Sequence, residues 1–350
     1  TIKKPSDYFN TKLYTGNGST NAITGVGFQP DWVWIKNRTD VSSHNLYDVV
    51  RGTSAGKLKS NSTAAESYNA QDLSVFGTDG FTVGSNNEVN GSSDNMVSWN
   101  WLANNTSGSS NTDGSITSTV SANTTAGFSI VSYTGTATSG VTIGHGLGVK
   151  PDMIILKNRG PDTASWPVYH SSLGATKYLG LNSTGASTTS NTRWNDAEPT
   201  STVFTLGSSG DVVGDSSGET FIAYCFAEKT GYSKFGSYTG NGSTDGTFVY
   251  TGFKPAFTIL KRTDATGGWI VVDNKRDTFN VAGKFLYPHD NGAEQDLTSS
   301  HTPLDFLSNG MKMRSSNLTG TTSLNISGAT YIYMAFAEEP LVGDNPATAR

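Results

Sequence analysis

The 350-residue chain lacks the features of a membrane, disulfide-bonded or nucleic-acid-binding protein. Its one cysteine, Cys225, excludes an internal disulfide. No apolar run reaches the roughly 18–20 residues of a membrane-spanning helix, and no signal-peptide pattern precedes Tyr8. The formal net charge is −5 and no Lys/Arg cluster occurs, which argues against a nucleic-acid surface. We therefore expect neither membrane insertion nor a nucleic-acid partner.

Charge and helical periodicity are also scarce. Charged residues make up 15% of the chain, against about 25% in a typical globular protein. No stretch carries the apolar i, i+3, i+4, i+7 stripe of an amphipathic helix. Aromatic residues nevertheless make up 11% of the chain, which a disordered chain would lack, and 40 glycines supply turns. The sequence therefore predicts a folded, all-β protein.

A long internal repeat organises the chain. A proline-led apolar run ending in basic residues occurs three times, each time after a Tyr-Thr-Gly turn and before an apolar closing strand. The three runs are GFQPDWVWIKNR (27–38), LGVKPDMIILKNR (147–159) and GFKPAFTILKRT (252–263), and the closing strands are 96–103, 221–228 and 331–338. The period of about 100–120 residues is far longer than a solenoid unit or propeller blade. Each copy is therefore long enough to form a domain with its own core.

We predict three tandem homologous antiparallel β-sandwich domains of jelly-roll-like architecture, because turn clusters recur every roughly 8–12 residues. The predicted domains span 1–103, 112–230 and 231–340. A Ser/Gly/Asn-rich stretch at 104–115 is expected to be a flexible linker, and 341–350 a C-terminal tail.

Within each copy the strands are expected to be buried. The run Trp32–Ile35 is apolar on both faces, which is typical of a central strand covered on both sides. The cations that follow such runs, Lys36 and Lys157 among them, are interpreted as solvated strand ends. In the closing strand Phe221–Glu228 the side chains alternate between two faces, and Cys225 is interpreted as a buried small hydrophobe rather than a nucleophile.

The sequence contains no convincing catalytic or metal-binding motif. The Gly-x-Ser-x-Gly match around Ser54 is not followed by the helix that a nucleophile elbow needs. The histidines lack zinc-site spacing and the Asp/Asn clusters match no calcium loop, so we expect no metal and no cofactor. Glu198, Asp196 and Asp215 form no recognisable acid pair, which makes a polysaccharide-active enzyme the least favoured interpretation.

Carbohydrate binding needs exposed aromatic rings beside Asn or Asp. Trp166 and Trp269 follow the repeated basic signature and precede β-type residues, so they are interpreted as core residues. Trp194 has no counterpart in the other copies and is followed by Asn195 and Asp196. It is therefore the candidate ligand-binding residue.

The repeated signature resembles that of a family of marine bacteriophage proteins. The segments that carry the resemblance are KPSDYFNTKLYTGNGSTNAITGVGFQPDWVWIKNR, TAGFSIVSYTGT with GHGLGVKPDMIILKNR, and YIYMAFAEEPLVG. These are repeat-containing virion proteins of phages that infect marine bacteria and cyanobacteria, with a domain of unknown function. The resemblance implies a non-enzymatic structural protein at the virion surface, in the capsid decoration, head fibre or tail fibre categories, and it transfers no catalytic residue.

Two functions remain open on this basis. The first is capsid decoration, in which the chain contacts other virion proteins as a homo-oligomer or as a monomer that imitates a trimer. The second is a tail fibre or receptor-binding protein that recognises a host-surface glycan. Neither heptads nor short shaft repeats occur in the chain, which favours the capsid.

Overall fold

The computed structural model describes residues 1–160, 164–298, 304–315 and 323–340, so the predicted tail 341–350 lies outside the described residues. The chain is all-β and forms several antiparallel sheets, as the sequence predicts. Its helices are single turns: η1 (Pro5–Asp7), α1 (Asn87–Asn90), α2 (Asn191–Trp194) and α3 (Gly210–Val213).

The strands fall into three consecutive sets, here called units 1, 2 and 3. Unit 1 holds β1 (Phe9–Thr15), β2 (Asn21–Thr24), β3 (Trp32–Asn37), β4 (Asn45–Asp48), β5 (Leu58–Lys59), β6 (Leu73–Gly77), β7 (Gly80–Val83) and β8 (Asn95–Trp101). Unit 2 holds β9 (Ser109–Asn111), β10 (Ser118–Asn123), β11 (Phe128–Thr134), β12 (Thr142–Gly144), β13 (Met153–Asn158), β14 (Pro167–His170), β15 (Lys177–Gly180), β16 (Thr188–Thr189), β17 (Val203–Thr205) and β18 (Thr220–Phe226). Unit 3 holds β19 (Ser233–Thr239), β20 (Phe248–Tyr250), β21 (Phe253–Arg262), β22 (Trp269–Asp273), β23 (Lys284–Phe285), β24 (Gln295–Asp296), β25 (Leu304–Leu307), β26 (Gly310–Met313) and β27 (Thr330–Pro340).

The main sheets of the three units share one strand order. The orders are β1-β8-β3-β4 in unit 1, β11-β18-β13-β14 in unit 2 and β19-β27-β21-β22 in unit 3. In unit 2 the sheet also extends through β10 to β9. Strand β9 lies inside the stretch 104–115 that the sequence suggests as a linker, so part of that stretch is paired into a sheet.

The proline-led strands are central, as predicted. Every residue of β3 and of β13 is buried. The closing strand β18 divides as its alternation predicts: Phe221, Ala223 and Cys225 face the core of unit 2, and Tyr224 and Phe226 face away from it. Each unit has a core of this kind on one face of its main sheet.

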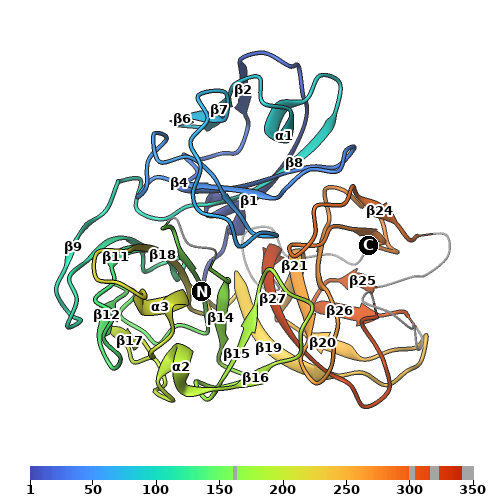
Figure 1. The fold of residues 1–350 in the computed structure, drawn as a ribbon. Coiled ribbons are helices and arrows are strands. Elements are labelled where there is room, and N and C mark those ends of the chain that lie inside the picture. The colour runs from blue at the N-terminus through green and yellow to red at the C-terminus, as the bar shows by residue number, and fades with distance from the viewer. Residues whose placement is uncertain (161–163, 299–303, 316–322, 341–350) are drawn as a thin grey trace.

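The opposite faces of the three main sheets meet in one shared core, which Figure 1 shows as three lobes around a common centre. Trp101, Phe226 and Phe336 are each directly opposite the proline-led strand of their own sheet, at Trp32, Met153 and Phe257. Their ring centroids lie 6.4, 5.7 and 6.1 Å apart in the three pairings. The expectation of three separate cores is therefore incomplete, because a fourth, aromatic core joins the units around an approximate three-fold axis.

Candidate functional site

The lysines at the ends of the proline-led strands are buried, so their interpretation as solvated strand ends is wrong. Lys36, Lys157 and Lys261 are each 0% exposed. The ammonium of Lys157, in unit 2, donates to the carbonyl oxygen of Thr63 in unit 1 at 3.0 Å. A loop of a neighbouring unit covers the strand end, and sequence local to the strand does not reveal such a loop.

The same contact recurs at the other two junctions. Lys36 of unit 1 donates to the carbonyl of Asn291 in unit 3 at 3.4 Å, and Lys261 of unit 3 donates to that of Gly185 in unit 2 at 2.8 Å. Unit 2 thus contacts unit 1, unit 1 contacts unit 3, and unit 3 contacts unit 2. The three contacts close a ring.

Desolvation by burial lowers the pKa of each of these lysines to about 8. The ammonium of Lys157 also donates to the carbonyl of Ala164 at 2.6 Å. Buried charge is tolerated only where such hydrogen bonds replace water. The three ammonium groups therefore bind the units together through backbone carbonyl oxygens.

An ionic network accompanies the lysine at the junction of units 1 and 2. Asp48 accepts hydrogen bonds from Arg51 Nε at 2.6 Å and from the hydroxyl of Tyr224 at 2.8 Å. Glu66 accepts from Arg51 at 2.5 Å and from Arg159 of unit 2 at 2.8 Å. The carboxylates of unit 1 therefore receive donors from both units.

The junction of units 1 and 3 carries the same arrangement. Asp273 accepts from Arg276 Nε at 2.6 Å and from the indole nitrogen of Trp99 at 3.0 Å. Glu294 accepts from Arg276 at 3.0 Å and from Arg38 of unit 1 at 2.7 Å. Breaking such a buried pair by removing one partner costs about 3–5 kcal/mol.

The junction of units 2 and 3 departs from this pattern. His170 is the last residue of β14, as Asp48 is of β4 and Asp273 is of β22, and its Nε2 lies 3.1 Å from the carbonyl oxygen of Tyr333. Ser187 donates from its backbone and its hydroxyl to the carbonyl of Thr263, at 2.9 and 3.0 Å. Neutral hydrogen bonds thus replace the buried ion pairs at this junction.

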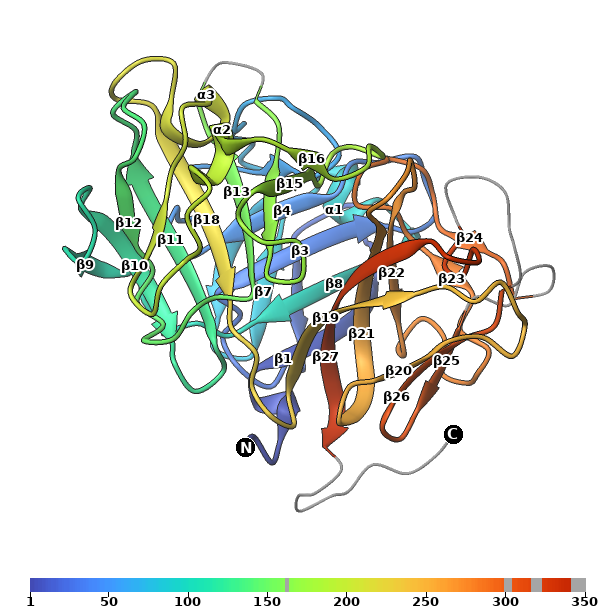
Figure 2. The same cartoon turned by 90° about the horizontal axis from the view of Figure 1, so that it is seen from below.

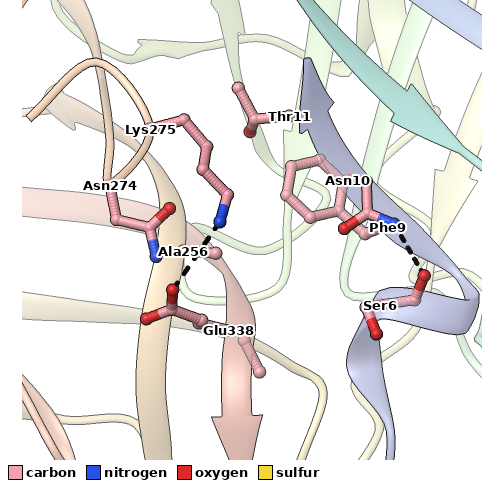
Figure 3. Close-up of a pocket in the computed structure, with 9 residues that line it drawn as sticks. Ser6, Phe9, Asn10, Thr11, Ala256, Asn274, Lys275 and Glu338 are labelled. Carbon is pink, nitrogen blue, oxygen red and sulfur yellow. Dashed lines mark hydrogen bonds and ion pairs between the residues drawn. The ribbon is translucent and has the colours of Figure 1, made fainter. Parts of the chain in front are cut away.

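A cavity of about 130 Å³ lies between units 1 and 3. Residues of η1 and β1 line one side, and Asn274, Lys275 and Glu338 lie opposite them (Figure 3). Figure 2 shows β1 beside β27 and β21, the strands that contribute residues to the cavity. A shallower hollow of about 560 Å³ shares four of the lining residues, Ser6, Asn10, Thr11 and Lys275. The cavity is therefore the deep part of a longer polar depression.

Trp194 does not form a ligand site. Its side chain is 1% exposed, and it packs against Tyr169 with ring centroids 6.0 Å apart in the core of unit 2. Stacking on a sugar requires an exposed ring face, so the sequence interpretation of Trp194 is corrected. Trp166 and Trp269 are core residues as predicted, 0% and 1% exposed.

The other sequence candidates lie apart from the cavity. Ser54 is exposed in a turn between β4 and β5. Glu198 accepts hydrogen bonds from Lys150, Tyr169 and the backbone of Ala175, at 2.6, 2.6 and 2.7 Å. Partial burial raises the pKa of the Glu198 carboxyl, but these hydrogen bonds outweigh it and hold the pKa below its ordinary value. Glu198 is therefore an anion whose hydrogen bonds connect three segments of unit 2.

Two further properties concern the parts of the chain that the structure describes. There, no three His, Cys, Asp or Glu side chains gather as metal ligands. In the same residues, no helix has the length and apolar character to cross a membrane.

A family described as a domain of unknown function, DUF7483, matches residues 4–340. No curated protein and no solved structure matches the chain. Because the family match spans nearly the whole sequence, the chain belongs to the DUF7483 family.

Proposed function

We propose that this chain is a non-enzymatic structural protein of a phage virion, located at the particle surface as a capsid decoration or head-fibre component. In this proposal it consists of three tandem homologous, jelly-roll-like β-sandwich domains. The observation that carries the proposal is the contact of Trp101, Phe226 and Phe336 on one axis. The resemblance of the repeated signature to marine phage virion proteins supports the particle context of this proposal.

The ring of junctions supports a structural role. Each unit donates a hydrogen bond from a buried ammonium to a backbone carbonyl of its neighbour, and two junctions add partly buried Arg–carboxylate pairs between units. A closed ring of three units gives one chain the shape of a trimer, which suits the three-fold points of an icosahedral shell. Other capsid proteins are the partners in this proposal.

The test is to locate and count the chain on particles. Purified virions should carry it on the head, at a copy number that matches a symmetry-related set of capsid positions by quantitative mass spectrometry and electron microscopy. Detection of only a few copies, confined to the tail, would overturn capsid decoration in favour of a tail fibre or receptor-binding protein. Absence of the chain from washed particles would refute both.

A further inference from the structure

The cavity between units 1 and 3 arises where the approximate three-fold symmetry fails. Thr11 on β1 lies opposite Trp99, Ile130 on β11 lies opposite Tyr224, and Phe235 on β19 lies opposite Met334. The three residues therefore occupy equivalent strand positions. Ile130 and Phe235 belong to the shared aromatic core, whereas the small polar Thr11 lines the cavity.

The facing wall of the cavity also differs from its equivalents. Asn274 directly follows β22, where Val49 follows β4 and Ser171 follows β14. Asn274 is 1% exposed, yet neither its Nδ2 nor its Oδ1 has a hydrogen-bond partner among the described residues. The hydroxyl of Thr11 is likewise without one there. Leaving a buried polar group unsatisfied is destabilising, so both side chains are suited to hydrogen-bond a bound polar molecule.

Lys275 adds a donor and Glu338 an acceptor to the same wall of the cavity. The ammonium of Lys275 lies 3.8 Å from a carboxylate oxygen of Glu338, whose other oxygen lies 3.0 Å from Lys254. Figure 3 shows the amide of Asn274 and the ammonium of Lys275 directed toward Glu338. The apolar side chains of Phe9, Ala256 and Ala337 complete the lining. The site therefore offers donors, acceptors and apolar contacts together.

We propose that this cavity binds a carbohydrate. One edge of the terminal sugar, which carries two adjacent hydroxyl groups, occupies the cavity. A hydroxyl both donates and accepts, so an adjacent pair matches the Nδ2 and Oδ1 of Asn274, which present one donor group and one acceptor side by side. A volume of about 130 Å³ is the share of roughly four water molecules, which fits one edge of a sugar. The adjoining hollow takes the rest of the glycan. This site does not depend on where the protein is located on a particle.

The test uses the purified full chain and variants taken from its own equivalent positions. Asn274→Val introduces the residue found at Val49. It removes both the NH2 donor and the carbonyl acceptor of the side chain and changes the side-chain volume little. Thr11→Phe introduces the residue found at Phe235 and fills the cavity, and Thr11→Ile is the milder form. Ser171→Val, at the equivalent position of unit 2, is the matched control.

Binding is measured with a glycan array, followed by titration calorimetry and ligand-observed NMR using the monosaccharides that correspond to hits. The wild-type chain and Ser171→Val should bind the same glycan, and Asn274→Val and a folded Thr11 variant should weaken binding by about tenfold or more. Melting curves verify folding, and Asn274→Val is expected to melt no lower than wild type because it removes an unsatisfied amide.

Several results would overturn the proposal. They are an array without hits, binding that both cavity variants retain, and saturation by free glycine, serine or glutamate without any sugar. The last result would assign the cavity to a zwitterion. None of them bears on the position of the chain in a virion, so failure of this proposal is distinguishable from failure of the proposed function.

Discussion

The indole nitrogen of Trp99 donates a hydrogen bond to a carboxylate oxygen of Asp273, 3.0 Å away and 174 positions further along the chain. This contact joins the closing strand of unit 1 to the end of β22 in unit 3. Both side chains are fully buried. One hydrogen bond thus connects a residue of the shared core to the ionic network around it.

Removal of the Asp273 charge tests this network. Asp273→Asn keeps an acceptor for Trp99 but takes from buried Arg276 its nearest carboxylate. We expect the free energy of unfolding to fall by about 3 kcal/mol or more, measured by urea denaturation. Asp48→Asn should have a similar effect at the other ionic junction. Asp264→Asn removes the partly exposed pair with Arg262 and should cost at most about 1 kcal/mol. Equal losses for Asp264→Asn and Asp273→Asn would contradict the prediction.

The buried lysines predict an unusual dependence of stability on alkaline pH. Burial lowers the pKa of Lys157 from 10.5 to about 8. Between these values the unfolded chain retains a proton that the folded chain has released, so raising the pH favours the folded state. For each lysine, the free energy of unfolding should rise by up to about 3 kcal/mol as the pH increases over this range. Lys157→Met should therefore gain less stability than wild type between pH 8 and 10, and Lys261→Met should behave alike. Parallel curves for variants and wild type would refute the assignment.

The junction of units 2 and 3 should respond to acid through His170. Desolvation lowers the pKa of His170 from 6.5 to about 4, although the hydrogen bond to the carbonyl of Tyr333 opposes the shift. Between pH 6.5 and 4 the unfolded chain binds a proton that the folded chain does not, so stability is lost as the pH falls. The loss from this residue approaches about 3 kcal/mol. His170→Gln should flatten the acid limb of the stability profile, and an unchanged limb would show that His170 is not responsible.

Cys225 should be chemically silent while the chain is folded. Its thiol is 0% exposed, and desolvation by burial raises its pKa. Because the thiolate is the reactive form, iodoacetamide should leave the native protein unmodified and alkylate it fully in denaturant, as read by mass spectrometry. Rapid alkylation under native conditions would show that the core of unit 2 opens readily.

The sequence predicts the strands of the fold well, because their signals are local. Alternation in Phe221–Phe226 predicted two buried faces, and the apolar run Trp32–Ile35 predicted a strand covered on both sides. Lys36 and Lys157 were misread because the groups that cover them come from units distant in sequence. The shared core could not be predicted for the same reason. Each main sheet has two apolar faces, and the residues that cover the second face belong to the other two units.

The cavity was also missed, although a signal for it exists. Alignment of the three copies places Thr11 with Ile130 and Phe235, and Asn274 with Val49 and Ser171. Thr11 is a polar residue at an otherwise apolar repeat position, and such a local departure is not part of any catalytic motif. Trp194 has no counterpart in the other copies, and its burial against Tyr169 shows that a residue unique to one copy can serve local packing rather than binding.

The ring of buried ammonium contacts limits how this architecture can change in length. In an open array of repeats a further copy simply extends the end, and the loss of a copy shortens it. Here each unit both supplies an ammonium to one neighbour and receives one from the other. A fourth copy would have to open the closed ring, and a shortened chain would leave one lysine without the carbonyl acceptor that the neighbouring unit supplies. The number of units is therefore fixed by closure at three, and diversification is confined to substitutions within them.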